Sequence, residues 1–223
     1  MSLRGAGSRR FLRVALVLLA ACGSPTIDEL ASSVVRVEAL PCGKTGVGTG
    51  SVVGEGLVLT NAHIVAGSID DVTVRTGSDE VLAAVVVGFD PERDLALLQV
   101  PDLELDPVVV GEFEDGSNGS ILARPGGVGL EVLDVVIVKS FNATGDDIYG
   151  EGDVSRRALE LSVDVSPGVS GAGVYDDEGR IVGVVFAESR RRDAVAYAVA
   201  GSEIEDFIAV TDTATPADTQ RCR

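Results

Sequence analysis

The chain has 223 residues, of which 45% are hydrophobic and 24% charged, enough to bury one globular core or a pair of fused barrels. Its formal net charge of −17 argues against a nucleic-acid partner. With 3 cysteines and 1 histidine, the chain has too few soft ligands for a metal site alongside other roles, so we expect neither a metal nor another cofactor.

Residues 1–21 have the composition of a bacterial lipoprotein signal peptide. Several arginines, with no acidic residue among them, precede an apolar run at residues 14–21. The run leads into Leu-Ala-Ala-Cys-Gly around Cys22, which resembles a lipobox, and an ordinary small-residue cleavage site is the alternative. Acyl chains on Cys22 would anchor the mature protein stably. We therefore expect secretion across the inner membrane and lipid anchoring at the outer face of the cell membrane or in the periplasm.

Short Val, Leu and Ile runs separated by Gly, Asp and Asn predict a succession of strands after a linker at residues 22–29. The first set lies at residues 34–37, 52–53, 57–59, 72–74, 81–87 and 96–100. After an acidic stretch, a second set lies at residues 120–122, 130–140, 158–165, 181–186 and 194–199. Residues 202–210 predict a short amphipathic helix, and a polar tail at 212–223 contains Cys222. This spacing favours an all-β barrel or sandwich within one domain at residues 30–211.

Three residues in this chain order form a candidate catalytic site. The only histidine, His63, lies in Leu-Thr-Asn-Ala-His-Ile-Val-Ala, Asp94 in Arg-Asp-Leu-Ala-Leu-Leu and Ser170 in Pro-Gly-Val-Ser-Gly-Ala-Gly. A serine hydroxyl is a weak nucleophile, so an imidazole must accept its proton and a carboxylate must orient that imidazole. We expect these roles for Ser170, His63 and Asp94, with the amides of Gly168 and Ser170 as the oxyanion hole.

Each of these residues also has a purely structural interpretation. A lone histidine in an apolar stretch is often a hydrogen-bonded structural residue, and serine among glycines or aspartate after Pro-Glu-Arg commonly forms a turn. Their occurrence together, in order, favours the catalytic interpretation.

The chain resembles trypsin-like serine proteases of the bacterial type, close to HtrA-type protease domains and to periplasmic MarP-like proteases. The resemblance rests on the three segments above, with further matches at residues 39–51, 147–150, 179–185 and 196–199. It implies two perpendicular six-stranded barrels, at about residues 30–105 and 116–200, with the catalytic triad in the cleft between them. It also implies a disulfide between Cys42 and a cysteine near the C-terminus, for which Cys222 is the candidate.

The serine segment departs from the family pattern. The family usually has Asn or Asp before the nucleophile and Gly-Gly-Pro after it, whereas Val169 precedes Ser170 here and Gly-Ala-Gly follows. A valine has no side-chain hydrogen bond with which to fix the oxyanion turn, and its β-branching restricts the backbone.

Two main hypotheses follow from the triad and from this departure. The first is an extracytoplasmic serine endopeptidase that hydrolyses peptide bonds of proteins through an acyl-enzyme on Ser170. The second is a catalytically inactive protease fold that binds envelope proteins or peptides. A third is a protease that stays inactive until acid, a redox change or a partner reorders the turn.

Asp164 is the candidate specificity residue. It lies six residues before Ser170, where trypsin-like enzymes place an acidic group that favours a basic residue before the cleaved bond. In the alternative, which we favour, Asp164 lies on the solvent side of a strand whose Leu159 and Leu161 face the core. The basic run 190–192 is expected to lie near the same pocket, although most such runs are merely solvated.

Overall fold

A computed structural model of the chain describes residues 24–68, 70–126 and 129–222. The expected signal peptide and the expected lipidation site at Cys22 lie outside these residues. Within them, no helix combines the length and the apolar character needed to cross a membrane.

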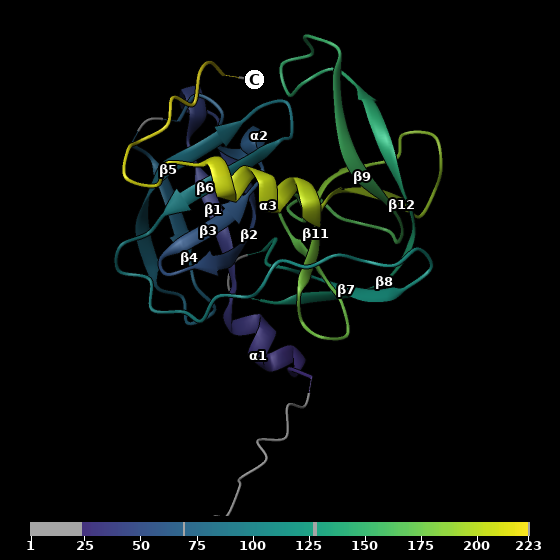
Figure 1. Ribbon diagram of the computed structural model, residues 1–223. Helices are drawn as coiled ribbons and strands as arrows, with labels where there is room; N and C mark the ends of the chain where they lie inside the picture. Colours follow the sequence, from purple (N-terminus) through teal and green to yellow (C-terminus); the bar gives the residue numbers. More distant parts are fainter. Residues whose placement is uncertain (1–23, 69, 127–128, 223) are drawn as a thin grey trace, which may run out of the picture.

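Two closed six-stranded antiparallel barrels make up the described chain (Figure 1). The first barrel consists of β1 (Val34–Ala39), β2 (Gly46–Gly54), β3 (Leu57–Thr60), β4 (Val72–Arg75), β5 (Val81–Asp90) and β6 (Leu95–Gln99). The second consists of β7 (Asn118–Ala123), β8 (Glu131–Gly145), β9 (Val154–Ser162), β10 (Gly173–Tyr175), β11 (Ile181–Glu188) and β12 (Val195–Ala200). The predicted fold class, two six-stranded barrels with a short C-terminal helix, is confirmed.

Three short α-helices accompany the strands in the described chain. They are α1 (Ile27–Ser32), the short α2 (Ala62–Val65) after β3, and α3 (Gly201–Val210) after β12, with a single 3-10 turn at Pro41–Gly43. In Figure 1, α3 runs across the junction between the barrels and the C-terminal tail continues along the first barrel. Ile204 and Phe207 of α3 are buried in that junction.

Strand β6 explains how the two barrels share one core. Its residues Ala96 and Leu98 face the interior of the first barrel, whereas Leu95 and Leu97 join a separate cluster that includes residues of the second barrel and α3. Because both of its faces are buried, β6 is a continuous apolar run rather than an alternating one. Burying a leucine side chain contributes about 1.5–3 kcal/mol, so β6 stabilises the barrel and the junction together.

Two elements differ from the expectations. The end of the predicted linker forms the start of α1, where Thr26 and Glu29 make a reciprocal capping box. The short strand β10 was not predicted, because it has a single Val, Leu or Ile residue, Val174, and begins within the glycine-rich serine segment. It nevertheless closes the second barrel, since it pairs with both β7 and β11.

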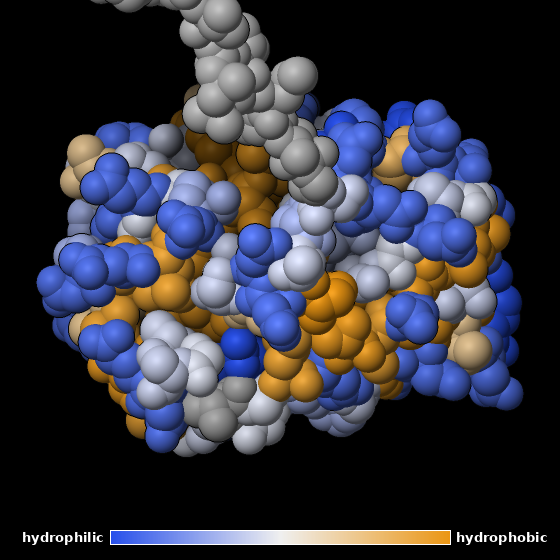
Figure 2. Space-filling view, turned by 90° about the horizontal axis from the view of Figure 1, so that it is seen from below, coloured by the Kyte–Doolittle hydropathy of each residue, from blue (hydrophilic) through white to orange (hydrophobic). Residues whose placement is uncertain are grey.

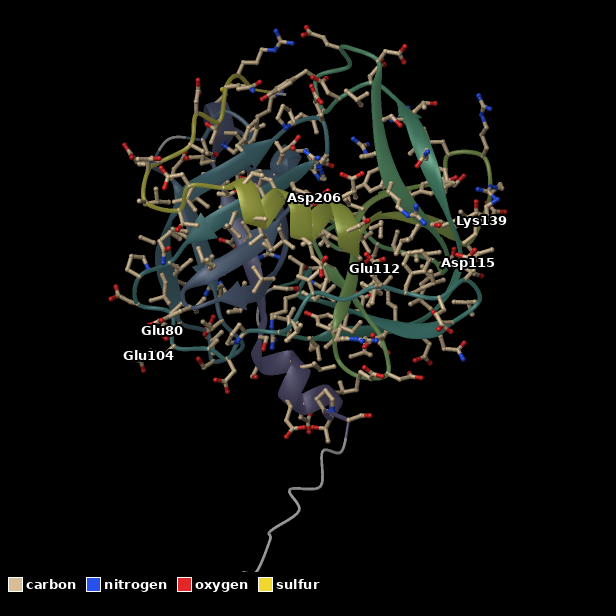
Figure 3. All side chains as sticks on the ribbon, in the orientation of Figure 1. Glu80, Glu104, Glu112, Asp115, Lys139 and Asp206 are labelled. Atoms are coloured by element: carbon tan, nitrogen blue, oxygen red, sulfur yellow. A yellow bond between two sulfur atoms is a disulfide. The ribbon has the colours of Figure 1, made fainter. Side chains whose placement is uncertain are left out.

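The surface carries the acidic excess of the chain. Figure 3 labels five exposed acidic residues: Glu80 of the first barrel, Glu104, Glu112 and Asp115 of the segment between β6 and β7, and Asp206 of α3. The face in Figure 2 shows hydrophilic side chains over much of its area, with smaller apolar patches between them.

Candidate active site

The histidine lies on a helix too short to be stable alone. Helix α2 follows β3, and its residues Ala62, Ile64 and Val65 are buried. Ile64 and Val65 pack into the core of the first barrel, and Ala62 packs in a small cluster with Ile148, which lies between β8 and β9. The His63 side chain is 16% exposed. A tertiary contact therefore sets the position of the proposed base.

Asp94 meets His63 through two separate hydrogen bonds. Its carboxylate lies 2.8 Å (Oδ2) and 3.1 Å (Oδ1) from His63 Nδ1, and Oδ1 also accepts the His63 backbone N–H at 2.9 Å. A carboxylate only accepts hydrogen bonds, so Nδ1 carries the proton and Nε2 has the free lone pair that a general base needs. The pair has the geometry of the base and its orienter.

The backbone around Asp94 is held in an uncommon conformation. Asp94 has a φ of 59°, and the Nδ2 group of Asn61 donates to its carbonyl at 2.9 Å. Just before it, the Asp90 carboxylate accepts the backbone N–H groups of Glu92 and Arg93 at 3.0 and 2.9 Å. This turn brings the buried Asp94 side chain under α2.

The nucleophile lies on a turn that only glycines can make. Gly168 and Gly171 have φ values of +95° and +82°. A Cβ at Gly168 would lie 2.7 Å from the Pro125 side chain, and one at Gly171 would lie 2.1 Å from the Thr49 carbonyl oxygen. Gly168 and Gly171 are thus required both because their φ values are positive and because a Cβ would not fit at either position.

The two expected oxyanion donors have no acceptor within the described chain. The Val169 N–H donates to the Ser166 carbonyl at 3.2 Å, and the Gly171 N–H donates to the Val185 carbonyl at 2.8 Å. Among the described residues, the Gly168 and Ser170 N–H groups make no such bond. Both N–H groups can therefore donate to a bound acceptor, as an oxyanion hole would need.

Val169 packs into the core of the second barrel, with 1% of its surface exposed. The Val169 side chain, directly before Ser170, therefore stabilises the barrel by apolar contact. It has no polar group with which to anchor the turn. The turn is anchored from the first barrel, where Thr49 contacts the carbonyls of Gly168 and Ser170.

Ile64 links the two halves of the site. A Cβ on Gly48 would lie 2.2 Å from Ile64 Cδ1 and 2.7 Å from the Ser170 carbonyl oxygen, and one on Gly171 would lie 3.3 Å from the same Cδ1. The residue after His63 therefore packs next to the serine turn. Within the described residues, no hydrogen bond joins His63 to Ser170, and such bonds are often long in unliganded enzymes.

A cavity of about 190 Å³ adjoins Ser170. Its lining is mainly apolar, with one carboxylate, and consists of Val165, Ser166, Pro167, Val169, Ser170, Val185, Ala187 and Glu188. Asp164 is exposed and is not part of this lining. It lies beyond the end of β9 at Ser162, so it is solvent-facing but is not within a strand as expected. Glu188 was not among the predicted site residues, and its position next to the cavity follows from the pairing of β11 with β12.

Within the basic run 190–192, the Arg192 side chain is paired. The Arg192 guanidinium donates to both Glu160 carboxylate oxygens at 2.8 and 2.9 Å and to the Tyr197 hydroxyl at 2.8 Å. These hydrogen bonds lower the pKa of Glu160. Arg192 lines a different cavity, of about 290 Å³, whose aromatic walls include Phe186.

The disulfide joins Cys42 to Cys222 with a Cα–Cα distance of 6.2 Å. It closes the C-terminal tail over α2, where the Gly67 N–H also donates to the Thr219 carbonyl at 3.0 Å. A cavity of about 230 Å³ is lined by both cysteines and by His63, so the tail forms one wall beside the proposed base. The part of the chain that the structure describes contains no His, Cys, Asp and Glu cluster able to hold a metal ion.

The barrels, the His63–Asp94 pair and the glycine turn around Ser170 define the class of this protein. The chain belongs to the trypsin-like peptidase domain family, which matches residues 48–184. The resemblance to trypsin-like serine proteases that its histidine and serine segments indicated is confirmed.

Individual relatives agree with this assignment. Serine protease Rv3671c of Mycobacterium tuberculosis H37Rv is 33% identical over 204 residues, which cover 89% of this chain and 51% of the relative. A probable periplasmic serine endoprotease, DegP-like, of Pseudomonas putida F1 is 28% identical over 160 residues, 69% of this chain and 32% of that protein. The chain thus spans about half or less of the length of these curated relatives.

A solved structure also resembles the whole described fold. The crystal structure of the Rv3671c protease from M. tuberculosis in its active form superposes with a TM-score of 0.84 at 31% identity, covering 97% of this chain and 99% of that one. The inactive form of the same protease gives a TM-score of 0.73 at 33% identity and covers 82% of this chain and 90% of that one.

Proposed function

We propose that this chain is an extracytoplasmic serine endopeptidase that cleaves proteins or peptides through an acyl-enzyme on Ser170. The observation that carries the proposal is the combination of an oriented His63–Asp94 pair with two unpaired amides on the Ser170 turn.

The proposed reaction begins with attack of Ser170 Oγ on the carbonyl carbon of the peptide bond. His63 Nε2 takes the Oγ proton, and Asp94 stabilises the resulting imidazolium. The Gly168 and Ser170 N–H groups donate to the oxygen that becomes negative. His63 then gives its proton to the leaving amine nitrogen as the C–N bond breaks, which leaves the acyl group on Ser170.

Deacylation repeats these steps with water. His63 takes a proton from the water as its oxygen attacks the acyl carbon, and the same two amides again hold the oxyanion. Return of the proton to Ser170 Oγ breaks the ester bond, which releases the carboxylic acid product and restores the enzyme.

The cavity beside Ser170 supports a preference for a small or medium apolar side chain before the cleaved bond. Its volume of about 190 Å³ and its Val165, Val185 and Ala187 walls suit such a side chain. Glu188 is exposed and lies at the cavity. A peptide series with Ala, Val, Leu, Phe and Lys at that position tests this preference, and highest kcat/KM for Lys would contradict it.

The lipobox at Cys22 and the DegP-like periplasmic relatives support an extracytoplasmic location with a lipid anchor. The full chain, expressed with labelled palmitate, should incorporate label and remain with the membrane fraction. The Cys22→Ser variant should lose both properties, while Cys42→Ser retains the label. Equal labelling of the two variants would contradict the anchor.

A fluorophosphonate probe tests the proposed nucleophile directly. The probe should label the wild-type domain and should fail on Ser170→Ala and His63→Ala, because labelling needs the nucleophile and its base. Ser155→Ala, which removes an exposed serine of β9 outside the cavity beside Ser170, is the control and should be labelled normally.

An inactive protein that binds peptides is the second candidate function. It is favoured by one observation, the buried valine at position 169 in place of a polar anchor. A folded wild-type domain that fails to react with the probe, yet binds unfolded envelope proteins, would establish this alternative. Probe labelling with the pattern above would exclude it.

A further inference from the structure

The fully buried residue Thr49 lies in the middle of β2, next to the serine turn of the other barrel. Its backbone N–H donates to the Ser170 carbonyl at 2.8 Å, and its Oγ1 lies 3.0 Å from the Gly168 carbonyl oxygen. The same hydroxyl accepts the backbone N–H of Arg124, at 3.0 Å, from the end of β7. One residue of the first barrel therefore contacts two segments of the second.

The partners of the hydroxyl fix the direction of its proton. The Arg124 backbone N–H can only donate, so it takes a lone pair of Thr49 Oγ1. The Gly168 carbonyl can only accept, so it receives the hydroxyl proton. A side chain that cannot both donate and accept a hydrogen bond would leave the Gly168 carbonyl or the Arg124 N–H without this partner at the interface between the barrels.

These contacts determine which way the peptide groups of the turn face. The carbonyls of Gly168 and Ser170, on either side of Val169, are both held toward the first barrel. Because a peptide unit is planar, holding the Gly168 carbonyl also fixes the Val169 N–H, which donates to the Ser166 carbonyl. The turn is thus kept in the conformation that leaves the Gly168 and Ser170 N–H groups unpaired.

Packing around Thr49 leaves little freedom for another arrangement. The Thr60 hydroxyl donates to the Thr49 carbonyl at 2.7 Å, which orients the peptide that faces Gly171. Pro125, one residue after Arg124, packs against Gly168 on the opposite side of the turn. The Thr49 hydroxyl therefore belongs to a buried, closely packed hydrogen-bond network and not to a surface contact.

We infer that Thr49 is a positioning residue for the oxyanion hole, acting from the first barrel on a turn whose own residue 169 cannot anchor it. The inference rests on the proposed function, because it concerns the same acyl transfer. Thr49 does not touch the substrate; it acts through the Gly168 and Ser170 peptide groups. Loss of its hydroxyl should lower kcat more than it changes KM, because negative charge on the oxygen develops only as the transition state is reached.

The test compares two pairs of variants. Thr49→Val preserves the shape and removes the hydroxyl, and it should lower kcat by about 10- to 100-fold with KM within about threefold of wild type. Thr49→Ser and Thr49→Ala both lack the methyl group and differ only in the hydroxyl, so Ser should recover most of the kcat that Ala loses. This second pair also gives an answer if the valine variant does not fold.

A peptide aldehyde supplies a readout that a purely structural role would not change. Its tetrahedral adduct uses the oxyanion donors, so its inhibition constant should rise in parallel with the loss of kcat. Thr211→Val is the control, since it removes a hydroxyl that donates to the Phe207 carbonyl at the end of α3. It should leave both kcat and aldehyde binding at wild-type values.

The outcomes distinguish this inference from the proposed function. If the wild type hydrolyses peptides and Thr49→Val and Thr49→Ala keep their kcat within about twofold, the positioning role is wrong and the proposed function stands. A parallel loss of kcat and melting temperature that Ser does not rescue also overturns the positioning role. If the folded wild type neither hydrolyses peptides nor reacts with the fluorophosphonate probe, the proposed function itself fails.

Discussion

The two halves of the candidate site are positioned by different parts of the chain. The first barrel holds His63 and Asp94 through side-chain hydrogen bonds made within that barrel. The second barrel presents Ser170 on a backbone turn whose shape depends on Gly168 and Gly171 and on contacts from the other barrel. Side-chain hydrogen bonds thus orient His63, the proposed base. Backbone conformation orients the Gly168 and Ser170 N–H groups, the proposed oxyanion donors. Substitutions in the two halves should therefore impair different properties.

Loss of the carboxylate at Asp94 should have the largest effect. In Asp94→Asn an amide replaces the group that holds the Nδ1–H tautomer, so kcat should fall by about 10⁴-fold in an enzyme of this type. Steady-state peptide hydrolysis measures the loss, and thermal unfolding checks that the fold remains. Asp164→Asn, at an exposed carboxylate outside the cavity lining, is the control and should retain activity. A decrease of less than tenfold in Asp94→Asn would remove Asp94 from the mechanism.

A methyl group on the serine turn should have the next largest effect. In Gly171→Ala the new Cβ would lie 2.1 Å from the Thr49 carbonyl oxygen at a φ of +82°, so the turn must shift. Displaced oxyanion donors predict a loss of about 10²–10³-fold in kcat. Gly150→Ala is matched for backbone strain, since Gly150 has a φ of +77° but open space around its Cβ position. If both variants lose activity equally, the close approach of Thr49 does not control the turn.

Loss of the disulfide should lower the free energy of unfolding more than it lowers catalytic activity. It joins residues 180 apart in the sequence, and loss of a bridge that closes a long loop costs about 2–5 kcal/mol. The Cys42→Ser/Cys222→Ser double variant should unfold at a lower temperature and keep kcat within a few-fold, because the tail also bonds to Gly67. Calorimetry and peptide hydrolysis, with and without reductant, measure the two properties. A large activity change at constant melting temperature would instead favour a protease that redox chemistry activates.

The sequence predicts those parts of the site whose chemistry is local. His63, Asp94 and Ser170 each lie in a short segment with a recognisable chemical pattern, and the apolar runs predict most strands of both barrels. The single histidine leaves no choice of base. The turn glycines are equally visible, because a glycine-rich stretch around serine indicates unusual backbone dihedrals.

The remaining features depend on how the barrels meet. Thr49 is part of the matching segment Gly-Thr-Gly-Ser, yet its contact with Gly168 joins residues 119 positions apart. Asn61 lies in the histidine segment, but its bond to the Asp94 carbonyl needs the turn of that distant residue. Val169 departs from the family pattern in sequence, and only the packing of the second barrel explains where its side chain goes. Two polar residues, Thr49 and Ser51, in a strand otherwise made of Gly and Val are the signal that could have identified Thr49.

The smallest effect should come from a side-chain contact in the second barrel, away from the serine turn. Arg192 hydrogen bonds lower the pKa of Glu160, so the ionised pair stabilises the fold above the ordinary carboxyl range and is lost as pH falls through the lowered pKa. Because the Arg192 side chain is 49% exposed, Glu160→Gln should lower the melting temperature at pH 7 by no more than about 2 °C. The difference from wild type should vanish in acid below that range, where wild-type Glu160 is also neutral. Glu104→Gln, at an exposed carboxylate in the segment that connects the barrels, is the control and should unfold at the wild-type temperature at pH 7. A deficit in Glu160→Gln that persists in acid would mean that packing around the larger cavity, and not the charge pair, supports this part of the second barrel.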